Sequence, residues 1–321
     1  MGRAVASAPG KAILFGEHFV VAGEPAIAVA VGLRARVEAV AGGDEIYVVS
    51  RNLSAEARFP LEGGGEGPLL PVAVAAREAL REAGANTGVH IVIDSEIPPA
   101  AGMGSSAAVA VATVAAVAAA AGSVLPAERV SELAYRAEEV VHGRPSGIDN
   151  TVSALGGAIL YRRGAGARRL NVDFGGVRLV LADTGLPRST GAMVRKVLAL
   201  REAYPEILGH VYSAAGVLAE KAAELLEKGD YESVGRLMDV NQGLLAAIGV
   251  STLEIEELVY AAREAGALGA KLTGAGGGGF VVALARSGDA ERVAARLREI
   301  SGRVYTAPIE AEGVRVEERD L

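Results

Sequence analysis

The sequence predicts an α+β protein with two domains. Its 321 residues are more than one hydrophobic core usually serves, and 50% of them are hydrophobic, which is ample for packed interiors. The first fifty residues alternate as strands do, whereas the second half runs strand, helices, strand, helix, strand. That order indicates a sandwich with helices on one face of a sheet. We expect the domains to span residues 1–170 and 171–321.

Strands and then helices make up the first domain. Alternating apolar residues and separating glycines predict strands at 3–8, 26–31, 34–40, 45–50, 89–95 and 158–161. Helices are expected at 69–83, 107–121 and 127–141. The second of these is Ala-rich and too short for a membrane span of about 20 residues, so we interpret it as a buried helix. The charged, glycine-rich stretch 162–169 is typical of a hairpin or exposed turn near the domain boundary.

Helices dominate the second domain. Helical spacing of apolar residues predicts helices at 190–203, 211–228, 231–248, 253–265 and 289–300. Strands are expected at 177–182, 280–285 and 303–309. A second glycine loop, at 273–279, precedes one of these strands, and its four consecutive glycines exceed what a turn needs. We interpret this loop as a place where the backbone approaches or closes over a ligand, with an ordinary turn as the alternative.

Composition and charge exclude several classes of protein. A formal charge of −7 argues against a nucleic acid partner, which requires a basic face. The absence of cysteine excludes disulfides and thiol chemistry. The four histidines lack metal-ligand spacing and no nucleophile motif is present, so zinc and hydrolase chemistry have little support. Without a secretory or membrane segment, we expect a cytoplasmic protein; a homodimer stays open.

The loop that reads Pro-Pro-Ala-Ala-Gly-Met-Gly-Ser-Ser-Ala, at 98–107, carries the strongest functional signal. It joins an expected strand to an expected helix, and a helix N-terminus stabilises anions through unpaired N–H groups and its dipole. Gly102 and Gly104 allow a sharp turn and close approach of a ligand, and Ser105 and Ser106 can cap the helix. The loop matches neither GxxxxGK[ST] nor GxGxxG. A phosphate site is predicted, and a Ser-capped buried helix is the alternative.

Three charged residues become candidates for catalysis or metal binding if the loop binds phosphate. Asp149 follows a turn, Pro-Ser-Gly-Ile, and could orient a hydroxyl and accept its proton, although alone it would be read as a helix-dipole partner. Lys11 could hold that carboxylate ionised and neutralise a transferring phosphoryl group, although a lysine is usually solvated. Glu138 and the hydroxyl of Ser106 are oxygen ligands that suit Mg²⁺, with a solvated helix charge as the alternative for Glu138.

These segments, in this order, resemble the GHMP kinase superfamily. The resemblance spans residues 8–279, and its three signatures are 9–11, 99–107 and 271–279. The closer resemblance is to the mevalonate kinases of the compact archaeal and bacterial type, carried by 11–28, 143–153 and 183–190. It implies an N-terminal domain like ribosomal protein S5, a C-terminal ferredoxin-like sandwich and an ATP cleft between them. Met103 stands where leucine is usual.

The resemblance also implies a role for each matching residue. Asp149 falls on the catalytic aspartate, Lys11 on the lysine beside it, and Ser106 and Glu138 on the Mg²⁺ ligands. The residues expected at the ATP phosphates are Ala101, Gly102, Met103, Gly104, Ser105 and Ser106. The residues expected near the acceptor are Glu17, His18, Thr190, Gly274, Ala275 and Gly276. ATP and Mg²⁺ would serve phosphoryl transfer to the 5-hydroxyl of mevalonate, a step in isoprenoid precursor biosynthesis.

Two other functions stay open. A sibling kinase acting on phosphomevalonate or another small alcohol would need additional cations, which Arg188, Arg195 and Lys196 could supply. A non-catalytic ligand sensor on the same fold should have lost Lys11 or Asp149, and both residues are present. The sequence does not decide whether Asp149 acts as a base or as a positioning group.

Overall fold

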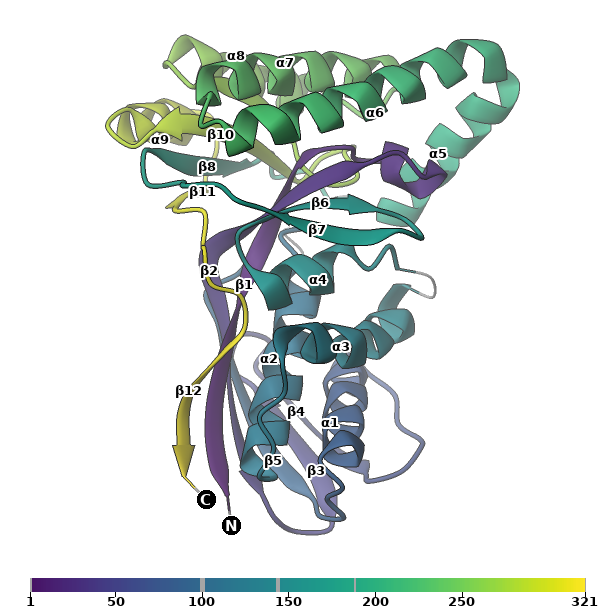
Figure 1. Cartoon of the computed structure of the whole chain (residues 1–321), viewed down its shortest axis with the longest axis vertical. Coiled ribbons are helices and arrows are strands. Elements are labelled where there is room, and N and C mark those ends of the chain that lie inside the picture. Colours follow the sequence, from purple (N-terminus) through teal and green to yellow (C-terminus); the bar gives the residue numbers. More distant parts are fainter. Residues whose placement is uncertain (1, 99–101, 143–144, 188, 321) are drawn as a thin grey trace. The chain divides into compact units, whose positions relative to one another are not determined.

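The computed structural model describes residues 2–98, 102–142, 145–187 and 189–320 (Figure 1). Its strands are β1 Arg3–Phe15, β2 Ala26–Ala41, β3 Glu45–Ser50, β4 Ala55–Pro60, β5 Val89–Ser95, β6 Ala158–Arg162, β7 Gly166–Leu170, β8 Val177–Asp183, β9 Gly269–Leu272, β10 Phe280–Arg286, β11 Val304–Ala307 and β12 Arg315–Asp320. Its helices are η1 Phe19–Ala22, α1 Leu70–Glu82, α2 Ser105–Ala120, α3 Ala127–His142, α4 Ile148–Leu155, α5 Thr190–Ala203, α6 Pro205–Glu227, α7 Tyr231–Ala247, α8 Leu253–Glu264 and α9 Ala290–Arg298.

The chain divides into two discontinuous units. Unit 1 comprises Met1–Lys11, Gly32–Gly156 and Glu312–Leu321, and unit 2 comprises Ala12–Val31 and Gly157–Ala311. This differs from the contiguous division at residue 170 expected from the sequence. The reason is that β1 and β2 are long strands whose first and second parts belong to different units. The final strand, β12, returns to unit 1 and pairs with β1.

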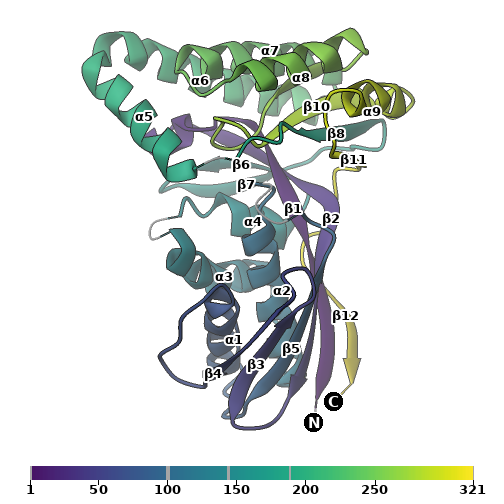
Figure 2. The same cartoon turned by 180° about the vertical axis from the view of Figure 1, so that it is seen from behind.

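Unit 1 is a sheet with helices packed on one face. Its strands follow the order β12-β1-β2-β5-β3-β4, and β3 pairs with β5 in parallel while β3 and β4 form an antiparallel hairpin (Figure 2). Helices α1, α2 and α3 pack on one another, and α1 and α2 contact the sheet. The core consists mainly of alanine and valine, and α2 is buried all round. Small side chains allow these helices to approach closely, which positions the N-terminus of α2 rigidly.

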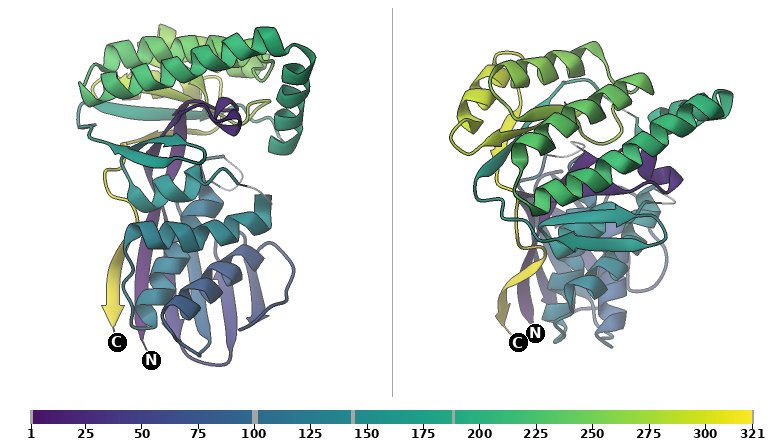
Figure 3. Two further views of the ribbon diagram at one scale, coloured as in Figure 1. Left: turned by 45° about the vertical axis from the view of Figure 1, so that its right-hand side comes forward. Right: turned by 45° about the horizontal axis from the view of Figure 1, so that its top comes forward.

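Unit 2 contains a four-stranded antiparallel sheet in the order β11-β8-β10-β9. Helices α7, α8 and α9 contact this sheet, and α6 packs on α7 (Figure 3). The hairpin of β6 and β7 pairs with the first part of β2 in the same unit. The α+β sandwich predicted from the sequence is therefore confirmed. No helix in the described part of the chain is both long and apolar enough to cross a membrane.

Several elements differ from the sequence prediction. The two strands expected at 26–31 and 34–40 are one strand, β2, and α6 begins at Pro205 rather than at 211. A proline in the first turn of a helix is a start signal that the apolar spacing did not include. Strands β4, β9 and β12 were not predicted. In β12, charged residues form ion pairs with Arg3 and Arg36 instead of an alternating apolar face, so its pattern carries no strand signal.

Candidate active site

The first glycine loop leads into a helix whose N-terminus has no side-chain cap. Helix α2 begins at Ser105, and its N-cap is Gly104, which adopts a left-handed conformation with φ 70°. The prediction that Ser105 and Ser106 cap the helix is therefore wrong, because they are its first two residues. Ser105 is half-buried and Ser106 is exposed. The first N–H groups of α2 thus remain available to an anion.

Lys11 lies directly against this loop. Its backbone N–H donates a hydrogen bond to the carbonyl oxygen of Met103 at 2.8 Å, and Met103 is fully buried. A Cβ atom at Gly104 would lie 2.8 Å from Cγ of Lys11, and one at Gly10 would lie 2.9 Å from the Met103 oxygen. These two glycines are required because the lysine stem and the loop backbone pass each other too closely for a side chain.

Asp149 and Lys11 form an ion pair. The distance between Nζ of Lys11 and Oδ1 of Asp149 is 3.2 Å, and the side chains are 5% and 29% exposed. Asp149 lies in the first turn of α4, after Gly147 in a left-handed conformation. The hydroxyl of Ser153, on the same helix, donates to the carbonyl oxygen of Pro9 at 2.7 Å. The structure therefore brings together the two residues singled out from the sequence, and α4 is fastened to the segment that carries the lysine.

Glu138 is a second carboxylate in this neighbourhood. It is only 4% exposed, whereas the adjacent Glu139 is exposed, so the alternative of a solvated helix charge is wrong for Glu138. Burial, with a contribution from the negative charge of Asp149, raises the pKa of Glu138 to about 8, although Lys11 acts to lower it. Two carboxylates near one lysine form an arrangement that a further cation would stabilise.

Any metal ion here would have few ligands from the protein. Within the ranges that the structure describes, no group of three or more histidine, aspartate or glutamate side chains could hold a metal. Glu138 supplies a carboxylate, and the exposed Ser106 supplies a hydroxyl at the start of α2. This oxygen-only set suits Mg²⁺, which takes one or two protein ligands and completes its shell with water and phosphate.

The second glycine loop, in unit 2, has a different character. Its five glycines, at 274 and 276–279, all have positive φ. A Cβ at Gly276 would lie 2.3 Å from the carbonyl oxygen of Val250, and one at Gly277 would lie 2.7 Å from Sδ of Met193. The N–H of Gly277 also donates to that Val250 oxygen at 2.8 Å. Close packing on neighbouring chain segments therefore explains Gly276 and Gly277, a reason that the sequence did not reveal.

His18 is joined to this loop by a hydrogen bond. Its Nε2 lies 2.8 Å from the carbonyl oxygen of Ala275, which accepts the proton of an Nε2–H tautomer. Burial lowers the pKa of His18, so the neutral ring is favoured and Nδ1 can accept a hydrogen bond. The backbone of His18 has φ 61°, which is uncommon outside glycine.

Glu17, which the resemblance places near the acceptor, has a side chain that is enclosed within unit 2. Its carboxylate is buried and forms an ion pair with Nζ of Lys271, and it accepts a hydrogen bond from Nδ2 of Asn241 at 3.2 Å. Sequence reasoning gave Lys271 and Asn241 no role. Lys271 belongs to the quoted motif at 271–279, and its place in an otherwise apolar strand was the signal that could have identified it.

The other predicted residues are either on α5 or outside the described residues. Thr190 is the exposed first residue of α5, after Ser189, whose hydroxyl accepts from the N–H of Ala192 at 3.3 Å. Lys196 donates to the carbonyl oxygen of Gly249 at 2.5 Å, and Arg195 is exposed. Three predicted segments lie outside the described residues: 99–101, which includes Ala101, 143–144, and Arg188.

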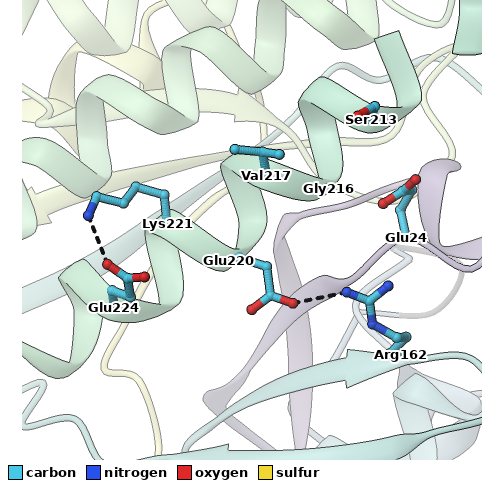
Figure 4. A pocket seen from close by; sticks show the side chains of 8 residues that line it. All are labelled: Glu24, Arg162, Ser213, Gly216, Val217, Glu220, Lys221 and Glu224. Atoms are coloured by element: carbon cyan, nitrogen blue, oxygen red, sulfur yellow. Dashed lines mark hydrogen bonds and ion pairs between the residues drawn. The ribbon is translucent and has the colours of Figure 1, made fainter. Parts of the chain in front are cut away.

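A shallow pocket in unit 2 is not part of this arrangement. It has a volume of about 350 Å³ and is lined by residues of α6 together with Glu24 and Arg162 (Figure 4). Four of its five charged side chains form pairs, Arg162 with Glu220 at 3.0 Å and Lys221 with Glu224 at 2.8 Å. These exposed pairs leave no buried polar group directed at a ligand, so we assign the pocket no function.

Comparison with known proteins gives consistent matches. The family description "GHMP kinases N terminal domain" matches residues 71–157, and "GHMP kinases C terminal" matches residues 222–301. A protein of Aeropyrum pernix named mevalonate kinase is 44% identical over 318 residues, which cover 98% of each chain. Two solved structures also match along nearly the whole length.

The solved structures are both mevalonate kinases. That of Methanococcus jannaschii has a TM-score of 0.84 and 25% identity, covering 95% of this chain and 98% of its own. That of L. major, in complex with R-mevalonate, has a TM-score of 0.82 and 30% identity, covering 98% and 97%. The similarity therefore extends over both units of the chain.

Proposed function

Because the chain belongs to the GHMP kinase family, we propose that it transfers the γ-phosphoryl group of ATP to the 5-hydroxyl of mevalonate. ATP as the phosphoryl donor follows from the family. The observation that carries the proposal is the Lys11–Asp149 ion pair, held against a glycine loop whose helix has an uncapped N-terminus. Relatives named mevalonate kinase over nearly the full length support the choice of acceptor.

The loop would bind the phosphates through its backbone. The N–H groups of Ser105, Ser106 and Ala107 have no partner one turn earlier in α2, and the dipole of this buried helix favours a negative charge. Gly102 and Gly104 remove side chains from the approach, and Met103 is directed into the core, so its difference from leucine leaves the backbone unchanged. Ala101 is proposed to extend the same contact.

Asp149 and Lys11 would act on the reacting groups. A carboxylate is in general a weak base for an alcohol. In a loose phosphoryl transition state, however, little proton transfer is needed early, so orientation of the hydroxyl and later acceptance of its proton suffice. Lys11 holds Asp149 in place and offers positive charge to the phosphoryl oxygens. Because Asp149 is partly exposed, its carboxylate can exchange this pairing for contact with a substrate.

We propose Mg²⁺ as the accompanying ion, held by Glu138 and Ser106. The buried Glu138 carboxylate, whose pKa is raised beside Asp149, fits this ion because a cation would favour its ionised form. When bound, Mg²⁺ would neutralise phosphate charge. The residues of the chain then have three tasks: Glu138 and Ser106 hold the ion, Asp149 orients the hydroxyl and Lys11 offsets negative charge.

We propose that His18, Thr190 and the Gly274–Gly276 backbone recognise the acceptor. His18 keeps Nδ1 as an acceptor for a substrate hydroxyl, because its Nε2 is bonded to Ala275. Glu17 would act indirectly, since its side chain is buried in the ion pair with Lys271. A site built on hydrogen bonds rejects an analogue that lacks the matching group far more strongly than an apolar pocket does.

An ADP-release assay with MgATP and a panel of alcohols tests the proposal. Mevalonate should be the best acceptor, with galactose and homoserine lower by about 10³-fold or more in kcat/KM. In the same assay, His18→Ala should raise KM for mevalonate more than KM for ATP. A higher kcat/KM for phosphomevalonate would instead identify a sibling kinase. Absence of turnover with every alcohol, together with nucleotide binding, would identify a ligand sensor.

Different structural observations bear on the two alternative functions, the sibling kinase and the ligand sensor. A phosphorylated acceptor needs an additional cation cluster, yet Lys196 already donates to the Gly249 carbonyl oxygen, and Arg188 is outside the described residues. A sensor would not need the Lys11–Asp149 pair, which is formed. We further propose that the enzyme works in the cytoplasm in isoprenoid precursor biosynthesis. Whether the protein forms a homodimer stays open, and light scattering of the purified protein tests it.

A further inference from the structure

Lys271 is a buried cation that the proposed chemistry does not use. Its side chain, on β9, is 0% exposed, and the Glu17 side chain is 1% exposed. Burial lowers the pKa of this lysine, while the adjacent Glu17 carboxylate acts to raise it. Burying such a pair is costly, and well-packed apolar residues in its place often give equal or greater stability. The pair therefore calls for an explanation other than stability.

The hydrogen bonds of Lys271 join two segments of unit 2. Its Nζ donates to the Glu17 carboxylate, to the carbonyl oxygen of Leu272 at 2.5 Å and to that of Ile13 at 3.5 Å. In return, the N–H of Ile13 donates to Oγ1 of Thr273 at 2.9 Å. Residues 13–17 are thus fastened to residues 271–273, immediately before each segment reaches a residue of the proposed acceptor site.

His18 lies just beyond this junction in a conformation that needs support. It is one of only two non-glycine residues with positive φ in the described chain, the other being Ser54. Glu17, on one side, is held by Lys271, and Phe19, on the other side, packs edge-on against Tyr212 with ring centroids 5.0 Å apart. Such a backbone persists only where the surroundings determine it, and such residues concentrate at functional sites.

We propose that Lys271 is a positioning residue for the acceptor, which holds Glu17 in the interior and thereby fixes the His18 ring against the Ala275 carbonyl oxygen. This inference rests on the proposed function only in naming the acceptor. The holding of His18 is a separate claim and can be measured without any substrate. Lys271 itself contacts no reacting group in this proposal.

Nitrogen-15 NMR of the histidine rings tests the holding of His18. The chain has four histidines, and the His18→Ala spectrum identifies the resonances of His18. The wild type should show a fixed Nε2–H tautomer, as the bond to Ala275 requires. In Lys271→Met, we expect shifts that average both tautomers. An unchanged tautomer in a folded Lys271→Met protein would overturn the inference, whatever the substrate proves to be.

Kinetics of the same variant test the consequence for the acceptor. Lys271→Met should raise KM for mevalonate by about 10-fold or more, with KM for ATP changed less than about 2-fold, since misplacing one orienting group weakens only its own ligand. In Lys271→Met/His18→Ala, KM should not rise beyond that of His18→Ala alone, because both changes remove the same interaction. Independent, multiplying effects would contradict the inference.

A double replacement separates positioning from stability. Lys271→Met alone leaves the Glu17 carboxylate buried without its cation, so Tm should fall; Lys271→Met/Glu17→Met removes both charges and should recover Tm. We expect the KM defect and the altered His18 tautomer to persist in that double variant. Recovery of KM together with Tm would show a merely structural pair. If Lys271→Met does not fold, the same measurements are made on the Lys271→Met/Glu17→Met variant.

Arg263→Met is a matched control. Arg263 forms an ion pair with Asp239 at 2.8 Å and donates to the carbonyl oxygen of Ala270, so it also supports β9, but its hydrogen bonds and ion pairs in the described structure do not include residues 13–18. We expect this variant to lower Tm without changing KM for mevalonate or the His18 tautomer. A rise in that KM equal to the rise in Lys271→Met would overturn the inference, because any loosening of β9 would then suffice.

Discussion

Each unit of this kinase contains a buried lysine paired with a carboxylate, Lys11 with Asp149 and Lys271 with Glu17, and the two pairs differ in exposure and in their further partners. Lys11 and Asp149 are 3.2 Å apart, the aspartate is partly exposed, and a second carboxylate, Glu138, lies nearby. Lys271 and Glu17 are fully enclosed, and backbone carbonyls accept further bonds from the lysine. A pair that remains partly open can exchange partners with a substrate, whereas an enclosed pair can only hold the chain in place.

The two glycine loops differ in the same way. In the first, Gly104 makes room for the stem of Lys11 beside a helix N-terminus that offers unpaired N–H groups. In the second, Gly276 and Gly277 make room for Val250 and Met193 of the protein itself. A glycine-rich sequence therefore has two physical explanations, and only the identity of the neighbouring atoms separates them.

A change at Asp149 is the strongest test of the proposed difference between the open pair and the enclosed pair. Asp149→Asn keeps the size of the side chain and removes its charge and its basicity, so kcat should fall by at least about 10²-fold. KM for ATP should change little, because the phosphates are proposed to rest on backbone N–H groups. Steady-state kinetics of the purified variant measures both quantities. Near-wild-type turnover would remove Asp149 from the reaction and leave the open pair without its proposed function.

Lys11→Met should have the next largest effect. The stem of the lysine is kept and the charge is lost, so kcat should fall by about 10-fold or more, as expected for removal of one electrostatic contact to the transition state. Tm should change little, because Asp149 is partly exposed and can be hydrated. Thermal unfolding beside kinetics separates the two effects. A large fall in Tm with normal kcat would show that this pair supports only the stability of the fold.

Changes at the two proposed metal ligands, Ser106 and Glu138, are expected to affect the requirement for Mg²⁺. Ser106→Ala and Glu138→Gln should each raise the Mg²⁺ concentration that gives half-maximal activity. The double variant should show less than the sum of the two free-energy changes, because both residues serve one ion. Titrations of activity against Mg²⁺ at saturating ATP measure this. Unshifted curves for both single variants would leave Glu138 as a buried carboxylate without a metal.

The smallest expected effect concerns pH and His18. Burial lowers the pKa of His18 below its ordinary value of 6.5, so the unfolded state binds its proton more readily than the folded state. The resulting contribution to the free energy of unfolding is complete above pH 6.5 and is lost as the pH falls below it. Urea unfolding from pH 5 to about 8 should therefore show that the free energy of unfolding falls less towards acidic pH in His18→Gln than in the wild type. An equal pH dependence of the free energy of unfolding in the two proteins would contradict the burial of this ring.

The sequence by itself predicted the chemistry that we propose for the first unit. The phosphate loop, Lys11 and Asp149 were recognised because each belongs to a short contiguous motif, and local geometry such as glycine turns and helix starts depends mainly on neighbouring residues. The α+β architecture also followed from periodicity, because most helices and strands carry a clear apolar face. The assignment of Asp149 to phosphoryl transfer remains a prediction until its variants are measured.

The tertiary structure alone decided what depends on contacts between distant parts of the chain. It determined that Glu138 is buried while Glu139 is exposed, that charged β12 completes the sheet beside β1, and that Glu17 pairs with Lys271, 254 residues away. None of these has a local pattern, because burial and pairing depend on which segments meet after folding. The sequence could mark Lys271 as a lysine in an apolar strand but could not identify Glu17 as its partner, whereas both members of the open pair were predicted from their motifs.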